Sequence, residues 1–398
     1  MDFISFSLNY WDDLWQSRHQ VMSLLAKKHK VLFVSPPFSR AQVFSAEERK
    51  RLPASGVVHR QDNLYTLVFP KWLFEIYRFP RIGRILTYLR ERHVRRIIKK
   101  LGFRDVVVFV WHPHFADVVG GFGEAVSCYY ADDEFASFAG LSEHARNQVL
   151  EQEDALLSHV DIVFVSGPAL MDKKNHYGNA INVPMGADFE LFSRSRKAET
   201  PVPADLEAVP HPRIGHIGNL NDKIDFRLVL EMSEARPNWS FVLVGPVNVR
   251  SAGFRADVDL LRKRPNVYLL GSKPRDMLPN YIKGLDVCMM CYRTDGWARY
   301  IYPLKLHEYL ASGKPVIGPP LMSLRDFTDV VRIADTPEKW VEGIEAGLND
   351  RDAALAQKRI QVAYENRLEK RIETIEEALE RKLREKTDGS ESPARSGG

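Results

Sequence analysis

The chain has 398 residues, of which 44% are apolar and 27% charged, a composition typical of a globular protein of about two domains. Three cysteines are too few for a disulfide framework, and no run of about 18 apolar residues predicts a membrane-spanning helix. The N-terminus shows no basic region followed by an apolar core, so a secretory signal is not expected and the pattern favours a cytoplasmic protein.

The first 190 residues alternate between apolar strands and amphipathic helices. One helix is expected to begin near Ser17, and another covers residues 142–157. Runs of β-branched and aromatic residues predict strands at residues 3–7, 30–35, 105–111, 126–130 and 160–165. Such runs suit parallel strands covered on both faces, so we predict a doubly wound α/β domain over residues 1–190.

The same alternation restarts after a polar linker expected at residues 191–212. It predicts a second α/β domain over residues 213–350, with strands at 213–218, 240–245, 267–271, 285–290 and 315–318. Cys288 and Cys291 have metal-site spacing but lie in an apolar run without a second pair, which favours a buried strand. Residues 351–386 predict a charged helix, and residues 387–398 are polar and expected to be disordered.

Positive charge is concentrated in residues 71–104. This stretch holds eleven Lys or Arg against two Glu, although the whole chain carries only +4. Apolar residues interleave with the cations at helical spacing, and aromatic residues gather at the start. We interpret the segment as an amphipathic, membrane-facing helix that meets anionic lipid. A core helix with a solvated basic face and a nucleic-acid patch are the alternatives, and we expect no nucleic-acid partner.

Residues 302–313 have the features of a short helix that faces a ligand. Pro303 suits the first helical turn and Gly313 the position after the last. Lys305 and Glu308, three residues apart, share one side. A helix N-terminus attracts phosphate, and Glu308 is placed to accept hydrogen bonds from ribose hydroxyls. A surface Lys–Glu ion pair explains the same spacing equally well, so these residues alone leave both interpretations open.

Together with the following Lys-Pro-Val-Ile at residues 314–317, this segment resembles the donor site of GT-B glycosyltransferases. The chain also resembles bacterial cell-surface polysaccharide glycosyltransferases of the group 1 or family 4 type. This resemblance lies in residues 15–20, 31–37, 129–134, 183–188 and 214–219. The resemblance implies two Rossmann-like domains that face each other across a cleft. It also implies that the C-terminal helix crosses back to the first domain, which would bind the acceptor.

The resemblance implies transfer of a sugar from a nucleotide-sugar donor, with UDP the expected nucleotide. The expected acceptor is a saccharide or a polyprenyl-linked lipid at the inner face of the cell membrane, in polysaccharide or glycolipid biosynthesis. Neither a cofactor nor a metal ion is expected. Retaining members carry a glutamate eight positions before Glu308, where this chain has Tyr300. A UDP-sugar 2-epimerase of the same fold and an inactive nucleotide-sugar-binding scaffold are the alternatives.

By position in this fold, further residues become candidates for donor binding. They include the turn after the first strand of the second domain and the residues that flank the nucleotide, and the full set is Gly218, Asn219, Lys223, Lys273, Arg293, Tyr302, Pro303, Lys305 and Glu308. The chain has no G-x-G-x-x-G and no Walker sequence, so nothing favours a dinucleotide or ATP site instead.

Carboxylates and histidines at strand ends of the first domain are the candidates for catalysis. Asp132 and Asp133 follow the strand at 126–130, and His112 and His114 follow the neighbouring one. The carboxyl ends of parallel strands meet at one edge, which places these side chains toward the cleft. An acceptor hydroxyl needs a base there, usually a carboxylate or histidine. We therefore predict Asp132, Asp133 and His114 as catalytic residues, with Asp12 and Asp13 of the first loop as a further option.

Overall fold

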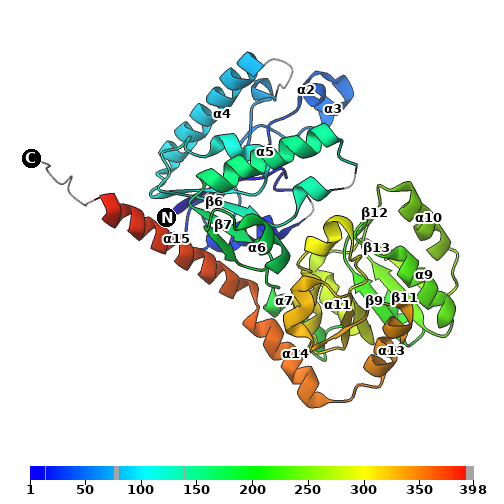
Figure 1. The fold of residues 1–398 in the computed structure, drawn as a ribbon. Helices are drawn as coiled ribbons and strands as arrows, with labels where there is room; N and C mark the ends of the chain where they lie inside the picture. Colours follow the sequence, from blue (N-terminus) through cyan, green and yellow to red (C-terminus); the bar gives the residue numbers. More distant parts are fainter. Residues whose placement is uncertain (14, 76–79, 139, 391–398) are drawn as a thin grey trace, which may run out of the picture.

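The protein folds into two α/β lobes, as a computed structural model shows for residues 1–398 apart from 14, 76–79, 139 and 391–398 (Figure 1). Each lobe is built on its own predominantly parallel sheet with helices on both faces. A long C-terminal helix leaves the second lobe and runs along the first. The predicted doubly wound α/β architecture is confirmed.

The first sheet has eight strands in the order β3-β4-β2-β1-β5-β6-β7-β8. Their bounds are β1 (Asp2–Phe6), β2 (Val31–Val34), β3 (Gly56–His59), β4 (Leu64–Val68), β5 (Val106–Val110), β6 (Val126–Ala131), β7 (Ile162–Val165) and β8 (Ala180–Asn182). Only the β3–β4 pair is antiparallel. The sequence pattern did not predict β3, β4 or β8. Of these, β3 and β8 form the two edges of the sheet, and β3 is exposed along its whole length.

Helices cover both faces of this sheet: α1 (Ser17–Leu25), α2 (Arg40–Phe44), α3 (Ala46–Arg51), α4 (Pro80–Leu101), α5 (Glu143–His159) and α6 (Pro168–Lys174). Short 3-10 helices η1 (Lys71–Leu73), η2 (Pro113–Val118) and η3 (Phe135–Ser137) follow strands or loops. Alternate residues of each strand enter opposite cores, as the pleat requires. Phe3 and Phe109 pack on one side of the sheet, Ile4 and Val108 on the other.

The second sheet has six parallel strands in the order β13-β11-β9-β14-β15-β16. They are β9 (Arg213–Ile217), β11 (Ser240–Val244), β13 (Val267–Gly271), β14 (Val287–Met289), β15 (Val316–Gly318) and β16 (Val331–Ile333), with a separate small pair, β10 (Leu220–Asn221) and β12 (Val247–Asn248). The helices are α9 (Phe226–Ala235), α10 (Ala252–Leu261), α11 (Leu278–Lys283), α12 (Lys305–Leu310) and α13 (Pro337–Leu348). Cys288 and Cys291 are both fully buried, as predicted, but only Cys288 lies in a strand, since Cys291 follows the end of β14.

The segment expected to be a polar linker is structured and packed. It contains α7 (Phe189–Ser193), η4 (Arg194–Arg196) and α8 (Ala204–Glu207). Phe192, Leu206 and Val209 are buried in the core of the second sheet. These apolar residues are too widely spaced to show a period, so the sequence pattern did not reveal that they pack.

The C-terminal stretch forms two helices rather than one, α14 (Ala353–Glu365) and α15 (Leu368–Ser390). Leu368, Ile372, Ile375 and Leu379 enter a core of the first sheet, so α15 crosses back as predicted. The chain passes from α14 to α15 against Gly186, where an added Cβ would lie 2.5 Å from the carbonyl oxygen of residue 366.

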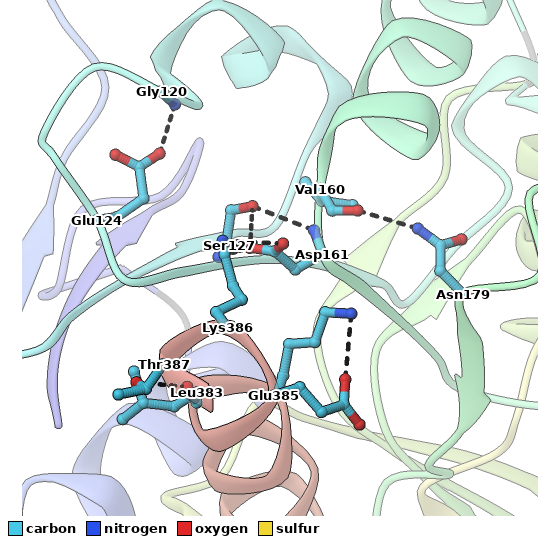
Figure 2. A network of polar contacts seen from close by, with 11 residues as sticks. Gly120, Glu124, Ser127, Val160, Asp161, Asn179, Leu383, Glu385, Lys386 and Thr387 are labelled. Atoms are coloured by element: carbon cyan, nitrogen blue, oxygen red, sulfur yellow. Dashed lines mark hydrogen bonds and ion pairs between the residues drawn. The ribbon is translucent and has the colours of Figure 1, made fainter. Parts of the chain in front are cut away.

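Polar contacts fasten the far end of α15 to the first domain (Figure 2). Lys386 Nζ lies 2.9 Å from Asp161 Oδ2, and the same carboxylate accepts a hydrogen bond from the Ser127 backbone N–H at 2.8 Å. The helix continues to Ser390, so the first four residues of the tail expected to be disordered are helical. Residues 391–398 lie outside the described part of the chain.

Candidate functional site

Two glycine turns meet at the carboxyl ends of β9 and β11. Gly218 follows β9, and its backbone N–H donates to the Val244 carbonyl at 2.8 Å. Gly245 has φ +148°, and a Cβ there would lie 1.8 Å from the Gly218 carbonyl oxygen. Only a glycine allows the two turns to approach so closely. The predicted Gly218 turn is therefore fixed against Gly245 by close backbone packing.

Helix α12 places Lys305 and Glu308 beside this turn. Lys305 Nζ lies 2.5 Å from Glu308 Oε2, and these side chains are only 16% and 10% exposed. A Cβ at Gly218 would come within 3.2 Å of Lys305 Cε. Both interpretations of the sequence spacing thus apply: the ion pair forms, but it is enclosed at the glycine turn and not on an open surface.

The helix itself is shorter than predicted. It begins at Lys305, with Leu304 as the N-cap residue, so Pro303 precedes the helix instead of filling its first turn. Gly313 follows it with φ +75°, as expected. The Ile217 backbone N–H donates to the Tyr309 hydroxyl at 2.7 Å, which ties α12 to the end of β9 and fixes Glu308 next to Gly218.

Lys223 brings a second cation to the same place. It lies in the loop before α9, and its ammonium sits 5.5 Å from the centre of the Tyr292 ring. Burial lowers the pKa of Lys223, the Asp133 carboxylate opposes that shift, and Lys305 adds to it. Lys223 of the second lobe therefore faces Asp133 of the first across the boundary between the two lobes, with Lys305 close to Lys223.

On the first-domain side, Asp132 is held by α1. Arg18 Nη2 lies 3.5 Å from Asp132 Oδ2, and the Ser17 hydroxyl donates to the same oxygen at 3.3 Å. Asp132 Oδ1 is buried and has no hydrogen-bond partner within the described residues. Burial raises the pKa of Asp132, while Arg18 and Ser17 lower it. An unpaired buried carboxylate oxygen is costly unless a ligand or water meets it.

Asp133 has the more strongly shifted carboxyl. Burial, with the charge of Asp132 added to it, raises the pKa of Asp133 to about 7, although Lys223 and Arg18 act in the opposite direction. A carboxyl group that titrates near neutral pH can both take up and release a proton during a reaction. Asp132 and Asp133 thus have different environments: one is paired with a guanidinium, and the other faces the lysines of the second lobe.

The structure separates His114 from the two aspartates. His114 Nε2 lies 2.9 Å from Glu75 Oε1, and the pair lines a cavity beneath α4. His112 stands between the two places, with its ring centre 6.5 Å from that of His114 and 4.3 Å from that of Phe135. Burial and the nearby His114 and Arg18 lower the pKa of His112 to about 3, so its imidazole is neutral at physiological pH.

The other predicted donor residues lie around this centre or at its margins. Asn219 Oδ1 accepts from Asn248 Nδ2 at 2.8 Å. Arg293 Nε donates to Asp295 at 2.8 Å. Lys273, which was expected to flank the nucleotide, pairs with Asp205, with its ammonium nitrogen 2.6 Å from the carboxylate. The Tyr302 hydroxyl contacts His307 Nε2 at 2.7 Å.

Tyr302 and Tyr300 lie at the boundary between the lobes. A Cβ at Gly167 of α6 would come within 3.5 Å of the Tyr302 ring. The Lys173 ammonium, also from α6, lies 5.3 Å from the centre of the Tyr300 ring. The position where retaining relatives carry a glutamate thus presents an aromatic ring to a first-domain cation.

The sequence did not predict the buried ionic network that lies next to Asp132 and Asp133. Glu134 is fully buried, with Lys173 and Lys174 ammonium groups each 3.0 Å from its carboxylate. Lys174 also lies 2.6 Å from Glu153, which accepts from the Tyr129 hydroxyl at 2.7 Å. The network joins α5 and α6 to the turn after β6. The adjacent lysines were visible in the sequence, but nothing there linked them to Glu134.

The described residues contain neither a metal-ligand cluster nor a membrane-spanning helix. No group of three or more His, Cys, Asp or Glu side chains in that part of the chain is arranged to hold a metal ion. None of its helices combines the length and the low charge needed to cross a bilayer.

Residues 211–350 match the family model for glycosyl transferases group 1. The matched part contains Gly218, Lys223, Lys305 and Glu308. The resemblance to group 1 glycosyltransferases is confirmed. A curated relative, the putative teichuronic acid biosynthesis glycosyltransferase TuaH of Bacillus subtilis (strain 168), is 32% identical over 188 residues. That alignment covers 46% of this chain and 46% of the relative, about half the length of each.

Solved structures show that the similarity of fold extends over both lobes. A sucrose-phosphate synthase from Thermosynechococcus elongatus superposes with a TM-score of 0.68 at 16% identity, covering 96% of this chain and 99% of that one. HepE from Anabaena, in complex with UDP, gives 0.67 at 11% identity, covering 96% and 100%. At such identities the likeness establishes the fold, which is GT-B, with two Rossmann-like domains and the returning C-terminal helix.

Proposed function

We propose that this chain is a glycosyltransferase that moves a sugar from a UDP-sugar to a saccharide or lipid-linked acceptor. The observation that carries the proposal is the enclosed Lys305–Glu308 pair at the Gly218 turn, beside Lys223, which faces Asp133. This pair lies in the part of the chain that matches glycosyl transferases group 1. HepE, which has the same fold, was solved with UDP, and this supports the choice of nucleotide.

In the donor complex, Glu308 accepts hydrogen bonds from the ribose hydroxyls. Lys305 is then released from Glu308 and turns, with Lys223, toward the diphosphate, whose charge the two ammonium groups offset. Lys305 Cε already lies beside Gly218, so the ammonium has only to exchange its Glu308 partner for the diphosphate when the nucleotide enters. Burial lowers the pKa of Lys223, and the negative charge of a bound diphosphate favours its charged form.

Asp133 is the proposed base. During transfer the bond between the sugar C1 and the diphosphate oxygen breaks, and a bond forms between C1 and the acceptor oxygen. The acceptor hydroxyl proton passes to Asp133, and UDP leaves with the bonding electrons. A carboxylate with a pKa of about 7 is a stronger base than an ordinary aspartate, so burial beside Asp132 gives Asp133 the required basicity.

We further propose that α4 holds the protein against an anionic membrane surface. Its solvent-facing stripe contains Ile82, Ile85 and Tyr88, 47%, 59% and 53% exposed, followed at helical spacing by exposed Arg92, Arg96 and Lys99. Trp72 of η1 is 60% exposed. Aromatic and aliphatic side chains next to cations suit the lipid interface. Residues 76–79 of the predicted segment lie outside the described residues.

The curated relative is described as acting in teichuronic acid biosynthesis, and it supports a cell-surface polysaccharide or glycolipid pathway for this chain. A cytoplasmic protein at the inner membrane face fits that proposal. No structural observation favours the epimerase alternative over glycosyl transfer.

The test is a panel of UDP- and GDP-sugars incubated with purified protein and a lipid extract, followed by mass spectrometry of the products. The proposal predicts UDP release that depends on one UDP-sugar and the appearance of a glycosylated product. Interconversion of free UDP-sugars without transfer would indicate a 2-epimerase. Binding of UDP-sugars with no product of either kind would indicate a scaffold.

A further inference from the structure

Helix α4 packs on the sheet in a way that changes along its length. In its second half the inner stripe is apolar, and Val94 and Ile98 are 1% and 7% exposed in a core of the first sheet. In the first half the same stripe carries Gly83, Arg84, Thr87 and Arg90, which line a cavity of about 320 Å³. An amphipathic helix normally turns apolar residues toward the sheet. This one turns polar residues toward an open space.

The floor of this α4 cavity is aromatic. Phe6 at the end of β1 is flanked by Phe122, stacked at 5.5 Å between ring centres, and by Phe115 at 5.8 Å. Phe69 at the end of β4 also lines it. The cavity therefore lies at the carboxyl edge of the sheet, where parallel α/β sheets bind their ligands.

The rim carries both hydrogen-bond donors and acceptors. Arg84 and Arg90 are cationic, and Glu75, Glu91 and Asp117 are anionic. The Arg90 guanidinium donates to the Leu73 and Phe74 carbonyls and to the Thr87 hydroxyl. Gln148 and Gln152 of α5 add amides that both donate and accept. A sugar hydroxyl also donates and accepts, and the C–H face of a sugar ring is apolar. Polar groups in balance around aromatic rings therefore match an uncharged sugar better than a phosphate, which would be repelled by the rim carboxylates.

The cavity shares a wall with the aspartate pair. Ser7, the residue after Phe6, accepts from Arg18 Nη1 at 3.5 Å, and Arg18 in turn pairs with Asp132. His112 connects the cavity to the aspartates on the other side. Its ring lies between that of His114, which lines the cavity, and that of Phe135, which follows Asp133 by two residues. A ring held on the phenylalanine floor is thus on the first-domain side of the proposed base.

We infer that the α4 cavity binds the acceptor, as one or two uncharged sugar rings, and this rests on the proposed glycosyl transfer. The volume is at the small end of the range for ligand pockets, which suits a short saccharide. His114, paired with Glu75, then contacts the acceptor as a binding residue instead of serving as a base. A lipid carrier on such an acceptor would leave along the outer face of α4, which carries Ile82 and Ile85.

The test measures binding of methyl glycosides of glucose, galactose and N-acetylglucosamine, with glucose 6-phosphate as a charged probe, by saturation-transfer NMR in the presence of UDP. Thr87→Trp fills the cavity from α4, while Thr87→Val keeps the size of the side chain and removes only the hydroxyl that accepts from Arg90 Nη2 at 2.8 Å. We expect Thr87→Trp to lose at least about tenfold in affinity for the preferred glycoside, and Thr87→Val to lose less than about threefold.

Two more variants keep the test informative if Thr87→Trp does not fold. Gln152→Ala removes a rim amide from the opposite helix and should weaken glycoside binding severalfold. Lys100→Ala changes an exposed residue at the other end of α4 and should leave glycoside binding unchanged. All variants should bind UDP like wild type.

Equal glycoside binding by Thr87→Trp and wild type, preference for glucose 6-phosphate, or absence of binding by any uncharged probe would each overturn the inference. Those results leave the proposed function standing as long as wild type binds UDP. Loss of UDP binding by wild type itself would instead contradict the proposed function.

Discussion

The two sides of the cleft between the lobes are built differently. The second-lobe side places cations and one carboxylate on neighbouring turns: Lys223 follows Gly218 by five residues, and Lys305 and Glu308 share one turn of α12. The first-lobe side places Asp132 and Asp133 against Arg18, which is more than a hundred residues away in sequence. The proposed donor side thus joins two short local motifs, whereas the proposed acceptor side pairs single residues from distant strands and helices of the first sheet.

The difference also concerns charge. Lys305 and Glu308 form an ion pair and neutralise each other on the proposed donor side. Asp132 keeps a buried oxygen without a partner in the described residues, and Asp133 has a pKa raised to about 7. We infer that the second-lobe side is arranged to bind the nucleotide, while Asp133 on the first-lobe side is arranged to exchange a proton with the acceptor. Each prediction below alters one side and leaves the other as a reference.

The largest effect is expected for Asp133→Asn. Removing a general base should lower kcat for transfer by about 10² to 10⁴-fold, and the affinity for UDP should stay within about twofold of wild type. The measurement is initial rate together with calorimetric titration of UDP. Asp172→Asn, on the exposed side of α6, is the control and should be fully active. Retention of more than a tenth of the activity by Asp133→Asn would assign the base to another group.

The pH dependence should be nearly as large. Asp133 acts as a base only when deprotonated, so activity should rise with pH, level off above about pH 8, and be about 100-fold lower at pH 5. Because the folded pKa lies above the unfolded one, this carboxyl favours folding at low pH and loses that contribution as pH rises toward 7. Asp133→Asn should therefore gain stability over wild type at pH 8 but not at pH 4. A flat rate profile from pH 5 to 8 would contradict the assignment.

On the donor side, Glu308→Ala should weaken UDP binding by about 2.5 kcal/mol, or about 70-fold, because it removes the charged acceptor for the ribose hydroxyls. Glu308→Gln, which keeps the shape and one acceptor oxygen, should lose less. Binding of methyl glycosides should not change in either variant. Calorimetry with UDP decides the matter: wild-type affinity in Glu308→Ala would place the nucleotide elsewhere.

A smaller effect is expected at the membrane face. Arg95 is engaged with Glu91 at 3.0 Å, so the residues to neutralise are the exposed Arg92 and Arg96. At about 1 kcal/mol each, Arg92→Gln with Arg96→Gln should reduce partitioning onto phosphatidylglycerol vesicles about 30-fold. The control is Arg381→Gln with Arg384→Gln on the exposed face of α15. It removes the same charge and should leave partitioning onto the vesicles unchanged. Vesicle flotation that is equal for the two double variants would exclude α4 as the contact.

The smallest expected effect is that of metal removal. Lys223 and Lys305 are proposed to offset the diphosphate charge, so a chelator such as EDTA should leave the transfer rate within about twofold. A rate that is lost with EDTA and restored by added Mg²⁺ or Mn²⁺ would show that the lysines alone do not suffice.

Much of the fold followed from local patterns. Apolar runs predicted β1, β2, β5, β6 and β7, and the edge strands β3 and β8 were missed because a short or exposed strand has no apolar run. The linker was expected to be loose, but Leu206 is fully buried in the second core. Its contact partners lie elsewhere in the chain, so its own neighbours gave no sign of burial.

The candidate site divides in the same way. The sequence by itself determined that Lys305 and Glu308 share one side of a short helix that ends at Gly313, because helical spacing is a local property. Only the tertiary structure decided that this pair is enclosed at the Gly218 turn, that His114 lies with Glu75 and away from Asp132, and that a polar stripe of α4 faces a cavity. Those contacts join distant segments, and the order of strands in the sheet, which no local pattern encodes, sets which segments meet.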